Sequence, residues 1–151
     1  MSLDVWHKNG WLRPHQASAS QTSELLAVAD RDLQDCLSEG LSEDWQFGIA
    51  YNAALQLARV ALHAAGYDTQ KGDSHHFRAL DSLQFTVRLD SDTIDQLQTF
   101  RKKRSAGVYE SVGMISQSDA REILKVAHEL RERVEQFLAA QHPELLQDPW
   151  D

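Results

Sequence analysis

The sequence predicts an all-α fold, an antiparallel bundle of about five helices. Apolar residues recur at helical spacing in five segments, and no apolar/polar alternation is long enough to indicate a sheet. Short connections between long amphipathic helices place neighbouring helices antiparallel. The 151 residues suit one domain with a sizeable core. We therefore expect one bundle domain.

The domain boundaries follow from where the helical spacing begins and ends. Residues 1–19 lack periodicity and carry Trp6 and Trp11, which predicts an irregular N-terminal arm that packs on something. Residues 20–142 form the predicted bundle. The remaining residues, 143–151, are expected to be a C-terminal tail.

The first predicted helix runs from a cap at Ser20 to about Ser38, with Gly40 as a terminator. Cys36 lies on its apolar face and is the only cysteine, so the chain offers no disulfide and no thiolate metal site. We interpret Cys36 as a small core residue.

The second predicted helix is expected to be central, because apolar residues cover most of its circumference. Ser42 caps it, Glu43 and Asp44 complement the dipole of its first turn, and it runs to Ala65 with Gly66 beyond. One narrow polar line interrupts the coverage, and such a line is usually a solvated face or an interhelical hydrogen-bonding seam. It consists of Asn52, Gln56, Arg59 and His63.

Three further helices complete the predicted bundle. The third spans about 75–90, with Asp73 or Ser74 as its cap, and Ser91 or Asp92 caps the fourth. After a loop at 108–117, Ser118 opens a fifth helix that ends near Gln141, before His142-Pro143. Its outward i,i+4 charge pairs are Glu129 with Arg133 and Arg131 with Glu135.

A basic cluster near the end of the fourth helix is the main candidate site. At about 100° per residue, Arg101 and Arg104 fall on the same side as the apolar Ile94 and Leu97. An arginine placed inward must be paired or must line a cleft, because an isolated buried charge is unfavourable. The alternative is an ordinary solvated helix C-terminus, in which basic residues followed by Gly107 complement the dipole.

The histidines are the only other candidates for chemistry. His75 and His76 are adjacent, and His63 lies on the preceding helix, but neighbouring helical residues point about 100° apart. No acidic pair stands beside them at ligand spacing. We therefore interpret them as capping or surface residues and predict neither a metal nor a cofactor.

Charge and missing motifs narrow the function classes. The net charge of −8 disfavours extended nucleic-acid binding but permits a compact basic site. The sequence has no phosphate-binding glycine loop, dinucleotide fingerprint or His-Glu-x-x-His motif. It also lacks a long apolar run or a signal-peptide pattern, so we expect a cytoplasmic location without membrane partners.

Three elements in order resemble the HEPN superfamily, small prokaryotic helical bundles found in toxin–antitoxin and defence systems. Ala50–Arg59 is similar to the family's central helix, which begins Ala-Tyr-x-Ala-Ala. Gly66-Tyr67, a polar loop and His75-His76 look like the next turn. Arg104 with Tyr109 resembles the Arg-x4-His element, with tyrosine in place of histidine. The resemblance covers about 21–141.

This resemblance implies a homodimer, often with a nucleotidyltransferase-like partner, and a site for a nucleotide or RNA. In the metal-independent ribonucleases of the family, the arginine and histidine act together on the scissile phosphate. Arg104 suits that role, whereas Tyr109 titrates too high for efficient acid–base work, and Ser105 stands where many active members have asparagine. We therefore expect a binding module without efficient catalysis. The expected phosphate-binding residues are Arg101, Arg104, Ser105 and Tyr109.

Two alternatives stay open at this point. One is a metal-independent ribonuclease whose catalytic residues are Arg104 and Tyr109. The other is a non-catalytic interaction scaffold that docks a partner through its N-terminal arm.

Overall fold

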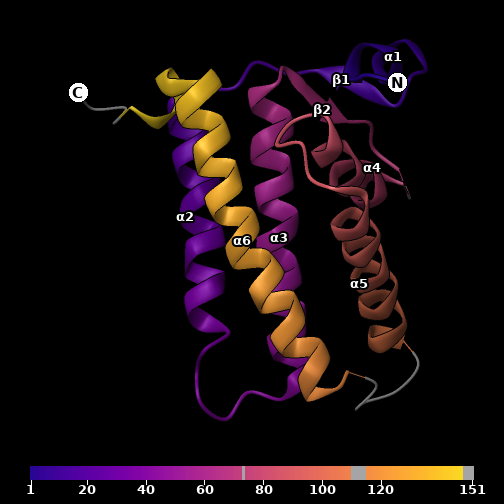
Figure 1. The fold of residues 1–151 in the computed structure, drawn as a ribbon, viewed down its shortest axis with the longest axis vertical. Helices are drawn as coiled ribbons and strands as arrows, with labels where there is room; N and C mark the ends of the chain where they lie inside the picture. Colours follow the sequence, from indigo (N-terminus) through magenta and orange to yellow (C-terminus); the bar gives the residue numbers. More distant parts are fainter. Residues whose placement is uncertain (73, 110–114, 148–151) are drawn as a thin grey trace.

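Long helices form the body of the protein (Figure 1). In the computed structural model, α2 (Ala19–Asp35), α3 (Glu43–Ala64) and α6 (Gln117–Gln141) pack together. Helix α5 (Ser91–Tyr109) lies on the other side of α3 from α2. The helices enclose one main hydrophobic core.

The structure describes residues 1–72, 74–109 and 115–147, and for 106–109 it describes the backbone alone. This part of the chain has six α-helices and one two-stranded sheet, which confirms the predicted all-α class. None of the helices described is both long and apolar enough to cross a membrane. The shorter elements are α1 (Leu3–Lys8), β1 (Leu12–Pro14), β2 (Tyr67–Thr69), α4 (His75–Asp81) and the 3-10 turns η1 (Ser82–Gln84) and η2 (Pro143–Leu146).

Helix α3 is the centre of the bundle, as predicted. The Ser42 hydroxyl accepts a hydrogen bond from Trp45 N–H at 3.2 Å, and Gly66 follows the helix with a φ of +98°. The helix packs against α2, α4, α5 and α6. Small side chains allow this close approach, because its buried alanines are at most 1% exposed: Ala50, Ala53, Ala54, Ala58 and Ala61.

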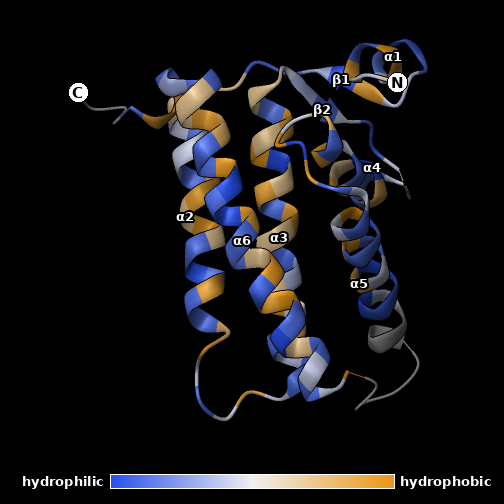
Figure 2. Cartoon of the chain, in the orientation of Figure 1, coloured by the Kyte–Doolittle hydropathy of each residue, from blue (hydrophilic) through white to orange (hydrophobic). Residues whose placement is uncertain are grey.

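Helices α2 and α6 are amphipathic and flank α3 (Figure 2). Their starts lie slightly earlier than expected, because Ser18 caps α2 and Ser116 forms a capping box with Asp119 at α6. Arg131 joins the two helices through an ion pair with Asp30 at 2.7 Å. It also makes the predicted i,i+4 pair with Glu135, at 3.4 Å.

The predicted third helix is too long. Helix α4 ends at Asp81, and the chain turns through η1 instead of remaining helical to residue 90. Arg88 adopts a left-handed φ of 59°, which a continuing helix forbids. Arg133 of α6 stabilises this turn by donating to the carbonyls of Val87 at 2.7 Å and Arg88 at 3.2 Å. These bonds replace the pair that we predicted between Arg133 and Glu129.

Both ends of α5 also differ from the prediction. The Asp90 carboxylate accepts the backbone N–H of Thr93 at 3.0 Å and its hydroxyl at 2.8 Å, so Asp90 takes the capping role. The helix then continues through Gly107, where we expected it to end, to Tyr109. A helical glycine is less favourable than alanine by only about 1 kcal/mol, and α5 tolerates it.

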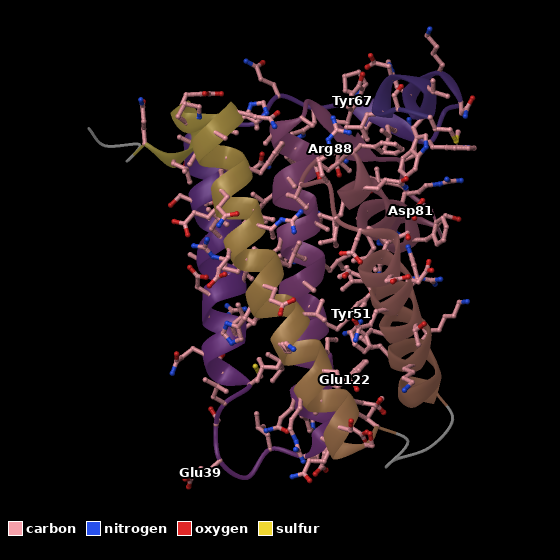
Figure 3. All side chains as sticks on the ribbon, viewed as in Figure 1. Glu39, Tyr51, Tyr67, Asp81, Arg88 and Glu122 are labelled. Carbon is pink, nitrogen blue, oxygen red and sulfur yellow. The ribbon has the colours of Figure 1, made fainter. Side chains whose placement is uncertain are left out.

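The N-terminal arm is structured rather than irregular. It contains α1 and β1, and β1 pairs antiparallel with β2, so that Leu12 faces Thr69 and Pro14 faces Tyr67. The Tyr67 hydroxyl, labelled in Figure 3, also donates to Asp4 of α1. Two strands of three residues each are too short to show a period of two in sequence. The arm therefore packs on its own bundle.

The predicted C-terminal tail is partly structured as well. Its 3-10 turn η2 packs against α2 and α6, and Leu145 joins the main core at 7% exposure. Residues 148–151 lie outside the described part.

Candidate functional site

A groove of about 520 Å³ opens among α3, α4, α5 and the strands β1 and β2; we call it the basic groove. The helical spacing of the polar line on α3 brings Asn52, Gln56 and Arg59 to one wall. The rest is formed by β1, β2, the loop after β2, the start of α4 and the last part of α5. Its ionisable lining residues are Arg13, Arg59, Asp68, Lys71, His75, His76 and Arg104.

Positive charge in the basic groove exceeds negative charge. Asp68 is the only carboxylate among its lining residues in the described part, and it is already paired with Arg13 at 3.0 Å. Arg59 donates to Gln56 Oε1 at 3.3 Å. Within the described residues, neither Arg59 nor Arg104 has an acidic partner. A protein of net charge −8 thus concentrates unpaired cations in one place.

Arg104 is held in the groove by an aromatic ring. Its guanidinium carbon lies 5.2 Å from the centroid of the Tyr51 ring, within the range of a cation–π contact. Figure 3 shows Tyr51 between α3 and α5. This contact restricts the long side chain of Arg104 while leaving the hydrogen-bond donors of the guanidinium available.

The Tyr51 hydroxyl is a buried polar group beneath this arginine. The side chain is 1% exposed, and its hydroxyl has no hydrogen-bond partner among the described residues. Burial raises the pKa of Tyr51 to about 12, against the opposing influence of Arg104 and Arg101. Tyr51 is therefore neutral at physiological pH. In the sequence, Tyr51 stands out only as the tyrosine of the Ala-Tyr-x-Ala-Ala start that resembles the HEPN central helix.

The pKa of His76 is lowered in the basic groove. Its ring lies 6.3 Å from that of Tyr51. Burial lowers the pKa of His76, and the nearby His75, Arg104, Arg101 and Arg59 lower it further. His76 is consequently neutral at pH 7, and a bound anion would favour its protonation.

Of the four predicted phosphate-binding residues, one is a lining residue of the basic groove in the described part of the chain. Arg104 lines the basic groove, but Arg101 does not: it donates to Gln98 Oε1 at 2.8 Å and lies 5.5 Å from the Phe77 ring centroid. Ser105 is exposed and is not a lining residue. The side chain of Tyr109 lies outside the described residues.

Sequence reasoning missed most of the residues that accompany Arg104. The sequence predicts a solvated face or an interhelical seam for Arg59, and capping or surface positions for His75 and His76. The one available signal is Arg59, an arginine on the polar line of an otherwise buried helix.

Comparison of the chain with protein-family models, curated proteins and solved structures finds no match. The groove itself is therefore the basis for a functional proposal.

A second groove of about 620 Å³, between α2 and η2, provides an internal comparison. It is lined by Glu24 and Asp30, and its Arg131 is already paired with Asp30 and Glu135. The two grooves are similar in volume but differ in charge. An anionic ligand should therefore bind in the basic groove in preference to the second groove.

Proposed function

We propose that the chain is a HEPN-like module that binds the phosphate of a nucleotide or of RNA in the basic groove. The observation that carries this proposal is the convergence of Arg59, Arg104 and His76 in one groove, with no acidic partner for either arginine among the described residues. Arg104 is also the residue that the HEPN resemblance assigns to phosphate.

Guanidinium groups suit this ligand because their planar array of N–H donors matches two phosphate oxygens at once. Arg59 reaches the groove from α3 and Arg104 from α5, so one phosphate could receive charge-assisted hydrogen bonds from two helices. The overall negative charge would repel a long nucleic-acid backbone beyond the groove. We therefore propose a ligand of one or a few nucleotides.

Equilibrium titration with ADP and with a short single-stranded RNA tests the proposal. We expect Arg104→Ala to weaken binding about ten- to hundredfold, since a hydrogen bond to a charged group contributes about 1.5–3 kcal/mol. Lys102→Ala is the matched control, because Lys102 is an exposed cation on the same helix. Equal affinities for both variants and the unmodified protein would contradict the proposal.

Ligand binding should also raise the pKa of His76. In the ligand-free protein, burial and the cations around His76 lower this pKa. A bound phosphate would offset the charge of Arg59 and Arg104. We expect the His76 ring to protonate at a higher pH in the presence of saturating ADP, as followed by NMR titration of its ring protons. His142, which lies away from the groove beside Phe137, is the control. An unchanged His76 midpoint would exclude a phosphate near that ring.

Metal-independent RNA cleavage is a second candidate function, favoured by the neutral imidazole of His76 in the same groove as Arg104. A neutral imidazole can accept a proton, which Tyr109 does poorly near neutral pH. This candidate predicts cleavage that survives a chelator and is lost in both Arg104→Ala and His76→Gln. Absence of cleavage by the purified protein would exclude it.

The HEPN resemblance also supports two proposals about assembly: a homodimer and a nucleotidyltransferase-like partner. Sedimentation equilibrium distinguishes a particle of one chain from a particle of two. A mass of one chain at all concentrations tested would contradict the homodimer.

A further inference from the structure

Three potential metal ligands meet where the N-terminal segment joins the bundle. His15 follows β1, His63 lies in the last turn of α3, and Asp68 belongs to β2. One ligand atom from each lies within 4.8 Å of the other two. We call these residues the His15–His63–Asp68 cluster. It shares Asp68 with the edge of the basic groove and is otherwise separate from it.

His63 has no satisfactory hydrogen bond despite its burial. It is 3% exposed, and neither ring nitrogen has a hydrogen-bond partner among the described residues. Its Nε2 lies 3.2 Å from Asp68 Oδ1, but the two atoms do not have hydrogen-bond geometry. Two ligands about 2.0–2.1 Å from a tetrahedral metal are separated by about 3.3–3.4 Å. The observed spacing therefore suits two ligands of one ion.

His15 offers the third potential ligand atom of the cluster. Its ring stacks on that of His63 with centroids 3.9 Å apart and planes inclined by 27°. His15 Nε2 bonds Gln21 Oε1 at 2.8 Å. A metal at the other ring nitrogen would leave this bond in place, and metal-binding histidines commonly make such an outer contact.

Asp68 is oriented by similar outer contacts. Arg13 donates to its Oδ2 at 3.0 Å, and the Thr69 N–H donates to its Oδ1 at 2.8 Å. Burial raises the pKa of Asp68, but the Arg13 and Thr69 hydrogen bonds, together with His63, outweigh this effect and lower it. Burial also lowers the pKa of His63, although Asp68 opposes this.

We propose that the His15–His63–Asp68 cluster binds one divalent transition metal ion of the Zn²⁺ class. Two imidazoles and one carboxylate suit Zn²⁺ and disfavour Mg²⁺ and Ca²⁺, which prefer oxygen ligands. Three protein ligands leave a fourth position for water. Because the ligands come from three segments, the ion would fasten the N-terminal segment to α3 and β2. Metal binding would therefore stabilise the fold.

Calorimetric titration of the full chain with Zn²⁺, together with the absorption spectrum of bound Co²⁺, tests this proposal. We expect one Zn²⁺ per chain, a higher Tm with Zn²⁺, and tetrahedral Co²⁺ bands. His15→Gln and His63→Gln should each weaken Zn²⁺ binding about a hundredfold or more, because loss of an outer contact alone weakens it about 10- to 100-fold.

The double variant His75→Gln/His76→Gln is the matched control and should bind Zn²⁺ as the unmodified protein does. His15 is only partly buried, so His15→Gln remains informative if His63→Gln fails to fold. The proposal is overturned if the unmodified protein binds no Zn²⁺. It is also overturned if His15→Gln leaves the affinity unchanged or if the control variant is the one that loses binding.

Discussion

Replacement of Trp6 by alanine is expected to lower the free energy of unfolding by about 3–5 kcal/mol. Trp6 is 2% exposed and belongs to a second small core with Leu12 and Leu62. Its ring meets those of Trp11 and Phe85 edge-on, with centroids 5.9 and 5.2 Å away. Urea denaturation followed by circular dichroism measures the loss.

Trp45→Ala is the matched control for Trp6→Ala. Trp45 is 67% exposed, so its replacement should change the free energy of unfolding by no more than about 0.5 kcal/mol. The reverse order of effects would contradict the packing described here. Unchanged stability of Trp6→Ala combined with lost binding to another protein would instead support the arm as a docking scaffold.

The double variant Arg59→Gln/Arg104→Gln is expected to weaken ADP binding by at least about a hundredfold. It removes both arginines that lack an acidic partner in the described groove lining, so the phosphate loses donors from α3 and α5 together. Because neither arginine forms an ion pair within the described residues, the double variant should not lower the free energy of unfolding by breaking one. Isothermal titration calorimetry with ADP, alongside thermal unfolding, separates binding from stability.

The control is Lys102→Gln/Arg121→Gln, which removes two positive charges from exposed positions on α5 and α6. It alters the net charge of the protein by the same amount. If both double variants lose affinity equally, the groove is not the binding site and the effect is one of overall charge.

Helix boundaries could be predicted where the signal is local. For α3, the Ser42 cap and the terminal Gly66 lie next to the segment that they delimit, and both act as expected. The turn at Val87 and Arg88, which follows α4 and η1, is held by Arg133, a residue of α6 that donates to both carbonyls. No local sequence pattern around residues 81–88 indicates that contact. The β1–β2 pair depends equally on distant residues.

In the candidate site, too, only the features with a local sequence signal could be predicted. The position of Arg104 on the apolar side of its helix predicted an arginine at a cleft or in a pair, and the structure places it in the basic groove. Its companions Arg59 and His76 belong to other helices, and only the packing of α3, α4 and α5 brings them together. Likewise, the sequence groups His63 with His75 and His76, whereas its neighbours in space are His15 and Asp68.

The location of bound ADP tests the central claim most directly. In an NMR titration of backbone amides, we expect the largest shifts at Gln56, Gly72, His76 and Arg104, which line the basic groove. Ser23 and Leu145, which line the second groove, should not move. Shifts centred on the second groove, or saturable binding that leaves the basic groove unperturbed, would contradict the account.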